Sequence, residues 1–340
     1  MGWLSLVLVL LGLSALLGCA AANRFYVPPA VEPVAVQRAG AAPLPFSSRL
    51  TLSTWNVGYA GMGRESDFVF DLGRQKRPLS ASLVDKNLAG ILEQVRKFDS
   101  DIILLQEGAD PSWVNYRRDV IGAIAAALPG YSYIYSADVD TRGVPPPWNV
   151  RVGNATFSRI SLSSAERRGL PLEPTFQLGV FRKSYRMLVA RIGDGREWVI
   201  INIHLSTFDS AEDDVRRAQA TALLAFAEAQ YRAGRYVVIG GDWNLRLARN
   251  DFPNTTEERF KFWIRDFPSD LTPEGWSWAV DPMIPTVRTA YQPYVAGENY
   301  TLNIDGFLVS PNVRIESVAG LDLDFEFSDH QPVTAAVAMR

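Results

Sequence analysis

Several polar side chains of this sequence directly follow short apolar runs. They are Asn56 in TWNVG, Glu107 in LLQEG, Asn202 and His204 in INIHLS, Asp242 and Asn244 in GGDWN, Asp305 in NIDGFLVS, and Asp329 with His330 in SDHQP. Loops that follow strands are where a rigid scaffold displays catalytic groups. Taken singly, each of these residues could form a turn or cap a helix. Together they supply hard oxygen donors and both histidines of the chain, which indicates a site for Mg²⁺, Mn²⁺ or Ca²⁺ rather than for zinc.

The apolar segments around these residues predict three helices that alternate with many strands. Strands are expected at 49–57, 101–106, 131–135, 153–160, 176–181, 186–192, 198–203, 236–239, 304–309 and 333–338, and helices at 82–98, 114–128 and 211–231. Apolar residues recur at helical spacing in 82–98, whereas the run DIILLQ is typical of a buried strand. This alternation favours a layered α/β fold over an all-helical or all-strand fold.

The amino terminus carries an uncharged apolar run at residues 2–18, which ends at the sole cysteine, Cys19. The run is shorter than the roughly 20 residues of a membrane-spanning helix, and it has the length of the apolar part of a signal peptide. It resembles the bacterial lipoprotein signal, in which the cysteine is acylated and becomes the first mature residue. An uncleaved signal anchor and an ordinary secretory signal are the alternatives.

The rest of the chain divides into a tether and one domain. Residues 20–47 are rich in alanine and proline and show no amphipathic period, which predicts an extended tether. Regular apolar segments then run from residue 48 to residue 340, which predicts a single catalytic domain. We therefore expect an exported lipoprotein, anchored to the membrane of the bacterial cell envelope through Cys19, with secretion as the alternative.

Composition argues against one kind of partner and excludes several kinds of site. The 340 residues carry 34 basic and 37 acidic side chains, for a formal charge of −3, so the net basic footprint of a non-specific nucleic-acid binder is absent. A single cysteine rules out an intramolecular disulfide, a CxxC redox pair and a thiolate zinc site.

The motifs TWN, QE, GNATFSR, NIHL, GDWN, IDGFLVS and SDH, in this order, resemble the endonuclease/exonuclease/phosphatase superfamily. The resemblance extends from about residue 50 to the carboxy terminus. It implies the DNase I-like α/β (α+β) fold, which is a four-layer sandwich of two facing mixed β-sheets flanked by helices. The site would lie at one end of the sheets.

The resemblance also implies which residues bind metal and water. Glu107 would be the carboxylate ligand of a divalent cation, Asn56 would support metal and phosphate, and Asp329 would add a further oxygen near the metal. Asp242 would orient or deprotonate the attacking water, and Asn244 would hydrogen-bond the phosphate.

The same resemblance assigns the two histidines and their neighbours. Asp305 would hold His330, whose cationic form could stabilise a pentavalent phosphorane. His204 would lie near the leaving group, with Asn202 beside it contacting phosphate, and the carboxylate partner of His204 is left open. Asn154 in GNATFSR would bind substrate, although a turn-forming Gly-Asn is an equal alternative.

Two long segments lack a regular pattern. Residues 59–85 include the basic cluster at 74–77 and would form either a solvated loop or a substrate-selecting lid. Residues 245–302 contain tryptophans that we expect in the core, and Arg288, whose forked guanidinium could bind a phosphate.

We expect a Mg²⁺-dependent phosphoester hydrolase that acts, as a monomer, on a small or lipid-linked phosphoester. The alternatives are an extracytoplasmic nuclease and a catalytically inactive binding module of the same fold. The acidic pI of about 5.6 and the small basic cluster argue against the nuclease. The acidic residues and both histidines of the motifs argue against an inactive module.

Overall fold

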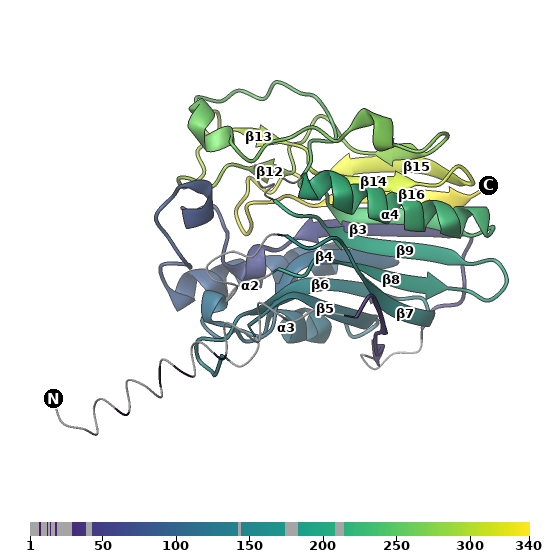
Figure 1. Cartoon of the computed structure of the whole chain (residues 1–340), viewed down its shortest axis with the longest axis horizontal. Coiled ribbons are helices and arrows are strands. Elements are labelled where there is room, and N and C mark those ends of the chain that lie inside the picture. The colour runs from purple at the N-terminus through teal and green to yellow at the C-terminus, as the bar shows by residue number, and fades with distance from the viewer. Residues whose placement is uncertain are drawn as a thin grey trace.

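Two β-sheets of seven strands each face one another in the computed structural model (Figure 1), which describes residues 29–38, 43–141, 144–173, 183–207 and 214–340, and residues 7, 12, 14 and 18 singly. Sheet A consists, in spatial order, of β1 (Val31–Pro33), β7 (Leu162–Gly169), β8 (Arg186–Ile192), β9 (Trp198–His204), β10 (Tyr236–Asp242), β14 (Asp305–Val309) and β11 (Ser277–Ala279). Sheet B consists of β15 (Val313–Gly320), β16 (Val333–Met339), β3 (Arg49–Asn56), β4 (Ile102–Ala109), β6 (Arg151–Ser158), β5 (Ser132–Asp140) and β2 (Gln37–Arg38). A separate ladder joins β12 (Val287–Arg288) to β13 (Thr301–Leu302).

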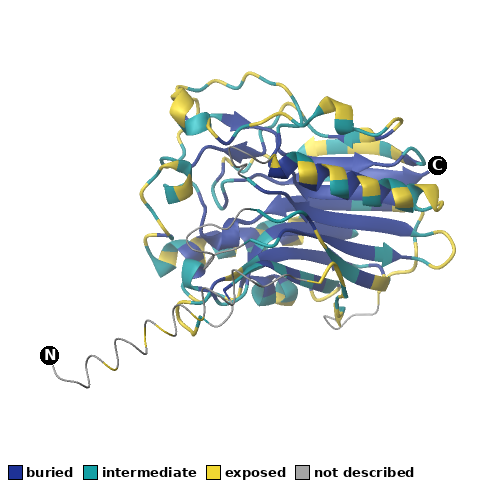
Figure 2. Cartoon of the chain, viewed as in Figure 1, coloured by how far each residue is buried: buried dark blue, intermediate teal, exposed yellow. Residues whose placement is uncertain are grey.

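Helices cover the outer faces of both sheets. Helices α2 (Ala81–Lys97) and α3 (Val120–Ala127) pack on sheet B, and α4 (Val215–Arg232) packs on sheet A (Figure 1). Alternate residues of the central strands point inward, where side chains from both sheets form one buried core, and outward against the helices. The central strands are buried along most of their length (Figure 2). This arrangement confirms the predicted four-layer sandwich.

Two crossover helices connect pairs of parallel strands. α2 connects β3 to its parallel neighbour β4, and α4 connects β9 to its parallel neighbour β10. Each helix begins at a side-chain cap: Ser80 accepts from the amide of Leu83, and Asp214 accepts from the amide of Arg217. Because parallel strands run in the same direction, the carboxyl ends of β3 and β4, and likewise those of β9 and β10, lie together.

Most elements expected from the sequence are present. The helix expected at 114–128 begins later, as α3, after a short 3₁₀ turn (Trp113–Asn115), and the strand expected at 176–181 lies outside the described residues. Strands β7 and β15 were not predicted. Their sequences LSSAERRG and VRIESVAG are largely polar, because part of each strand is exposed to solvent.

The segment predicted as a free tether belongs in part to the sandwich. β1 pairs with β7 at the edge of sheet A, and β2 pairs with β5 at the edge of sheet B. Val34 and Val36, between them, pack against the inner core. The folded domain therefore begins by residue 30 rather than at 48. Strands of two or three residues are too short to show a periodic pattern, and their ladder hydrogen bonds come from the backbone.

The carboxylate of Glu32 fastens β1 to sheet A. It accepts from Arg167 at 2.6 Å and from Arg186 at 2.7 Å, and the Arg186 side chain is only 3% exposed. We expect Glu32→Gln to lower the free energy of unfolding by about 1–3 kcal/mol, because it leaves a buried guanidinium without its counter-ion. Urea denaturation measures this effect. Glu93→Gln, which breaks the exposed pair with Lys97, is the control and should leave the free energy of unfolding essentially unchanged.

The pH dependence of this contribution has a definite sign. The hydrogen bond and charge of Arg167, together with those of Arg186, hold the pKa of Glu32 below its usual value. The stabilisation is therefore present at neutral pH and is lost as the pH falls through the pKa of the folded state. Equal urea midpoints for wild type and Glu32→Gln at neutral pH would contradict this assignment.

Candidate active site

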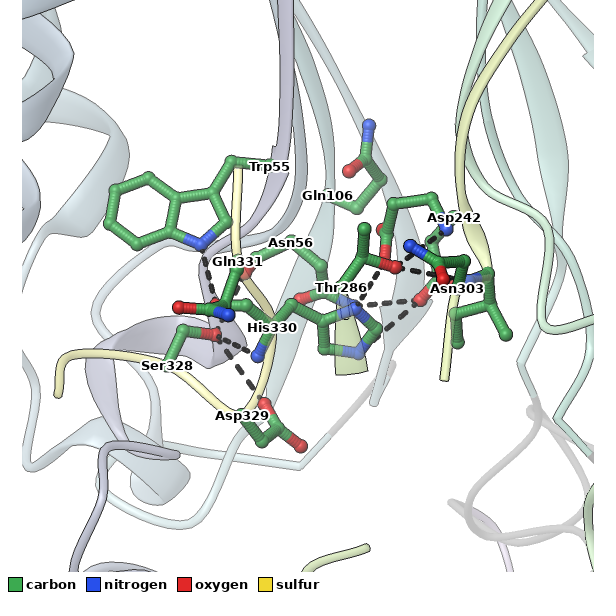
Figure 3. Close-up of polar contacts among 12 residues, drawn as sticks. Trp55, Asn56, Gln106, Asp242, Thr286, Asn303, Ser328, Asp329, His330 and Gln331 are labelled. Atoms are coloured by element: carbon green, nitrogen blue, oxygen red, sulfur yellow. Dashed lines mark hydrogen bonds and ion pairs between the residues drawn. The ribbon is translucent and has the colours of Figure 1, made fainter. Parts of the chain in front are cut away.

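Three of the predicted residues meet where their strands end. Asn56 ends β3, His204 ends β9 and Asp242 ends β10, and the strand register places Asp242 opposite both His204 and Asp305. All of them point into the space between the sheets at one end of the sandwich. His330, in the loop before β16, points toward Asp242 in the same place (Figure 3).

A β-bulge brings Glu107 into this group. Leu105 pairs with Ala155 and Gly108 with Gly153, so that two residues of β4 oppose only Asn154 of β6. Glu107 has a φ of 53°, in the left-handed region, which turns its side chain away from the outer face. Its Oε1 lies 4.0 Å from Nε2 of His204. The bulge therefore explains how two successive residues, Gln106 and Glu107, both point inward.

Asp242 lies between the two histidines. Its Oδ2 is 3.6 Å from Nε2 of His204 and 3.6 Å from Nε2 of His330, and Nδ1 of His330 contacts Oδ2 of Asp305 at 2.9 Å. Burial opposes a charge on His330, but the charges of Asp305 and Asp242 outweigh it and raise the pKa of His330 to about 10. Burial and the neighbouring charges of Lys183 and His330 instead lower the pKa of His204. At neutral pH, His330 is therefore an imidazolium and His204 a neutral imidazole.

Two asparagines fix the carboxyl group of Asp242. Nδ2 of Asn56 donates to Oδ2 at 3.0 Å, and the backbone amide of Asn244 donates to Oδ1 at 2.9 Å. Asn244 has a φ of 48°, and its own Nδ2 donates to the carbonyl of Leu205. Asn244 thus lies at the site. Burial raises the pKa of Asp242, so this carboxyl group is a stronger base than an exposed one.

The sequence analysis did not identify the residues that hold His330 in place. Nε1 of Trp55 donates to the carbonyl of His330 at 2.9 Å, and the hydroxyl of Ser328 donates to the carbonyl of Asn56 at 2.8 Å (Figure 3). The hydroxyl of Thr286 accepts from the amide of Asp305. Tryptophan, serine and threonine occur throughout the chain, so nothing in the sequence distinguishes these three.

Asp329 lies beside the same group. Its Oδ1 is within reach of the Ser328 hydroxyl, at 3.4 Å, and its charge raises the pKa of Glu107 in addition to the larger effect of burial. Asp329 and Glu107 are thus close enough to repel each other. A cation between them would relieve this repulsion.

Asn154 is buried next to the bulge. Within the described part of the chain, neither its Oδ1 nor its Nδ2 has a hydrogen-bond partner. Buried amides are normally satisfied, so one that is not is available for a ligand or water. This position favours the substrate-binding interpretation over the turn, because Asn154 lies within β6.

Two predicted substrate-binding residues have other partners. Nδ2 of Asn202 donates to the carbonyl of Ala155 at 2.9 Å, and its Oδ1 accepts from Gln106 at 2.7 Å, so the side chain ties the two sheets together. The guanidinium of Arg288 is buried and donates to the carbonyl of Gly63 at 2.8 Å and to the hydroxyl of Ser66. These contacts correct both expectations, and we assign Asn202 and Arg288 structural roles.

Lys183 is a cation at the site that the sequence analysis missed. It forms a bridge with Val139 just before β8, and its Nζ lies 5.4 Å from the ring centroid of Tyr185. The Tyr185 ring in turn packs edge-on against His204, at 5.6 Å. The charge of Lys183 acts on both His204 and Glu107. The signal available in the sequence was a lysine just before a strand that runs antiparallel to the one ending in His204.

If the site hydrolyses a phosphoester, as the sequence leads us to expect, Lys183→Gln should lower kcat/KM by roughly 100-fold, because a fixed cation beside His204 and Glu107 would stabilise negative charge that develops there. Steady-state kinetics measure this loss, and circular dichroism shows whether the fold is retained. Lys97→Gln, on the exposed surface of α2, is the matched control and should leave kcat/KM unchanged. A folded Lys183→Gln protein with wild-type kinetics would remove Lys183 from the site.

The comparisons with known proteins agree with this geometry. The model of the Endonuclease/Exonuclease/phosphatase family matches residues 53–330. The match covers most of the chain and includes every residue of the site, from Asn56 to His330. The chain belongs to this family. Its members are hydrolases that act on phosphoesters, and they typically depend on a divalent metal. No curated protein matches the chain with significant similarity.

Solved structures of this family share the fold. An endonuclease/exonuclease/phosphatase from Beutenbergia cavernae is 19% identical, with a TM-score of 0.56 over 86% of this chain and 72% of that one. A second from Bacteroides vulgatus is 15% identical, with a TM-score of 0.53 over 86% and 100% of the two chains. The human nocturnin catalytic domain, with a bound sulfate anion, is 17% identical, with a TM-score of 0.52 over 90% and 98%.

The acidic cluster of this family member fits a divalent cation. Ligand atoms of Asp242, Asp305 and His330 lie within 4.8 Å of one another, and Oδ1 of Asp305 is buried with no partner in the described part of the chain. Burial also raises the pKa of Glu107 and of Asp242, so bringing a positive charge close to them would be favourable. His330 is protonated and engaged with Asp305, which leaves Glu107, Asn56 and Asp329 as the better candidates to hold the cation.

Proposed function

We propose that this protein is a divalent-metal-dependent phosphoester hydrolase that acts on a small or lipid-linked phosphoester at the bacterial cell envelope. The observation that carries the proposal is the arrangement of Asp305, His330 and Asp242 beside Glu107. The carboxylate of Asp305 pairs with the imidazolium of His330, and the buried carboxyl group of Asp242 lies beside that ring. Glu107, the candidate metal ligand, lies at the same end of the sandwich, next to His204. Membership of the family supports the same chemistry.

Each residue of the site has a separate role in the proposed reaction. Asp242, with its raised pKa, orients and deprotonates the attacking water, and Asn56 keeps its carboxyl group in place. His330 stays charged because of Asp305 and stabilises the phosphorane opposite Asp242. Mg²⁺ held by Glu107, with Asn56 and Asp329, would polarise a phosphoryl oxygen and offset charge that grows in the transition state. Mn²⁺ or Ca²⁺ could take its place.

His204 lies on the other side of Asp242, where the leaving group would depart. The carboxylates nearest its Nε2 are Asp242 at 3.6 Å and Glu107 at 4.0 Å, which already have other roles. A neutral His204 beside the cation of Lys183 can donate a hydrogen bond to the leaving oxygen. Asn154, with its unpartnered amide, is the candidate to bind a non-bridging phosphate oxygen.

The charge of the chain favours a compact substrate. The chain carries a net charge of −3, whereas a nuclease that grips several phosphates needs a basic surface. In the basic cluster at 74–77, Arg77 is engaged by Trp113 and Tyr116, which leaves little of the cluster for extended DNA. Cys19 and most of the signal segment lie outside the described residues, and in the part that the structure describes no helix combines the length and apolarity needed to cross a bilayer. Anchoring at Cys19 therefore remains our proposal.

The purified protein should hydrolyse bis(p-nitrophenyl) phosphate in the presence of Mg²⁺ and lose this activity when EDTA is added. Parallel assays on p-nitrophenyl phosphate, inositol phosphates, phospholipid vesicles and plasmid DNA identify the substrate class. We expect a small or lipid phosphoester to be cleaved faster than DNA. Rapid plasmid cleavage with a steep salt dependence would favour the nuclease instead, and no hydrolysis of any phosphoester would favour an inactive module.

A further inference from the structure

We propose that the end of the sandwich that carries the active site faces the membrane surface, so that the site takes phosphoesters presented by the lipid bilayer. This inference rests on the proposed function and on the proposed attachment of the chain near Cys19. It is carried by two independent observations. One is the point at which the amino-terminal chain leaves the domain, and the other is the position of exposed apolar side chains.

The chain enters the domain at the active-site end. The amide of Gly169 donates to the carbonyl of Ala30 at 2.9 Å, and Gly169 pairs with Arg186 at the start of β8. β8 runs antiparallel to β9 with Leu188 opposite Asn202, and extending this register by two residues brings Arg186 opposite His204. Ala30 is therefore on a level with His204 along the strands, three strands away within the same sheet.

The remaining leader is short. Cys19 precedes Ala30 by 11 residues, which span at most about 40 Å when fully extended. A tether that continued to residue 47 would span roughly 100 Å and would allow any orientation. β1 and β2 fix residues 31–38 to the sandwich, so the leader joins the folded domain at Ala30. An anchor at Cys19 would therefore hold the active-site end, rather than the opposite end, near the membrane. An uncleaved signal anchor would act at the same place.

Large apolar side chains are exposed on the loops at this end. Leu72 is 56% exposed and Leu79 is 70% exposed, both in the connection between β3 and α2, and Trp148, between β5 and β6, is 62% exposed. Both loops leave their strands at the active-site end. Arg74 and Lys76 are exposed between the two leucines. Apolar side chains mixed with basic ones suit the boundary between the headgroups and the acyl chains of a bilayer.

The backbone displays these leucines on fixed turns. The amide of Val69 donates to the carbonyl of Gln75, and Oδ2 of Asp71 accepts from the amide of Ala290, so the turn that carries Leu72 is anchored on both sides. The hydroxyl of Tyr116 donates to the carbonyl of Pro78, directly before Leu79. Exposed leucines on an anchored backbone cannot collapse onto the protein, and a lipid surface is the partner that the nearby leader supplies.

Labelling of cysteines introduced one at a time into the full chain, which keeps Cys19, tests this orientation. Leu79→Cys places a thiol at the active-site end, and Leu44→Cys places one at the opposite end, where Leu44 is 48% exposed. Both variants are labelled with an environment-sensitive NBD fluorophore and reconstituted into vesicles of phosphatidylethanolamine and phosphatidylglycerol that contain nitroxide-labelled lipid. The wild-type chain, treated identically, gives the background from Cys19.

The expected result is several-fold stronger quenching of the label at position 79 than of the label at position 44. Equal quenching at both positions, stronger quenching at position 44, or recovery of the wild-type protein in the soluble fraction would overturn the proposal. Hydrolysis of water-soluble bis(p-nitrophenyl) phosphate by the same samples is measured in parallel. Loss of that activity with asymmetric quenching would refute the proposed function alone, and full activity with symmetric quenching would refute the orientation alone.

Discussion

Replacing Glu107 by glutamine is expected to lower kcat/KM for a phosphodiester by at least about 1000-fold, with the fold intact. The change removes one negative charge and little volume. A metal-bound phosphoryl group gains several kcal/mol of transition-state stabilisation, and each 1.4 kcal/mol corresponds to about tenfold in rate. Because glutamine still offers an oxygen at the same place, excess Mg²⁺ should restore part of the activity. Kinetics over a graded series of MgCl₂ concentrations measure both effects.

The control for this variant is Glu228→Gln on the exposed surface of α4, which should show wild-type kinetics at every Mg²⁺ concentration. A Glu107→Gln protein as active as wild type at low Mg²⁺ would show that Glu107 does not hold the cation. In that case, Asp242, Asp305 and His330 would be the next candidates to bind the cation.

Replacing His330 by alanine is expected to abolish turnover, and Asp305→Asn to lower kcat roughly 100- to 10,000-fold, because an orienting carboxylate fixes both the tautomer and the direction of an imidazole ring. The two variants differ in their pH profiles. The charge of Asp305 helps to raise the pKa of His330 to about 10, so the wild-type imidazolium persists through neutral pH and is lost above that value. Without this charge the pKa falls, and the alkaline limb of the pH–rate profile should move to lower pH.

The pH–rate profile of kcat for wild type and Asp305→Asn between pH 6 and 10.5 provides the measurement. Asp324→Asn, on the exposed loop before His330, is the control and should leave the profile unchanged. A lower rate with an unshifted alkaline limb would mean that Asp305 only positions the ring and that the charge of His330 has no part in the reaction.

The sequence predicted the site residues that lie at strand ends, because a polar residue directly after an apolar run is a local feature. How deep a side chain lies within the sandwich depends on segments far away in the sequence. Asn202 and His204 lie on the same face of β9, two residues apart, yet Asn202 is one step deeper and bonds across to sheet B, whereas His204 reaches the site. Only the position of the opposite sheet separates these two roles.

Arg288 shows the same limitation for a charged residue. Its forked guanidinium could bind a phosphate, but the side chain is buried and donates instead to Gly63 and Ser66. Lys183 shows the reverse case, because a lysine without a motif reaches the site when β8 starts beside the end of β9. The order of the strands determined both outcomes, and that order follows from pairings between segments far apart in the chain.

The pairing of residues 31–38 with both sheets also affects how this protein can be shortened. A chain that begins at residue 48 would expose the backbone hydrogen-bonding groups of β7 and β5 as open sheet edges, and would leave the buried guanidinium of Arg186 without Glu32. Open edges of this kind pair with other molecules and lead to aggregation. A soluble form for crystallisation or assay should therefore keep the residues from 29 onward, although their alanine- and proline-rich sequence invites removal.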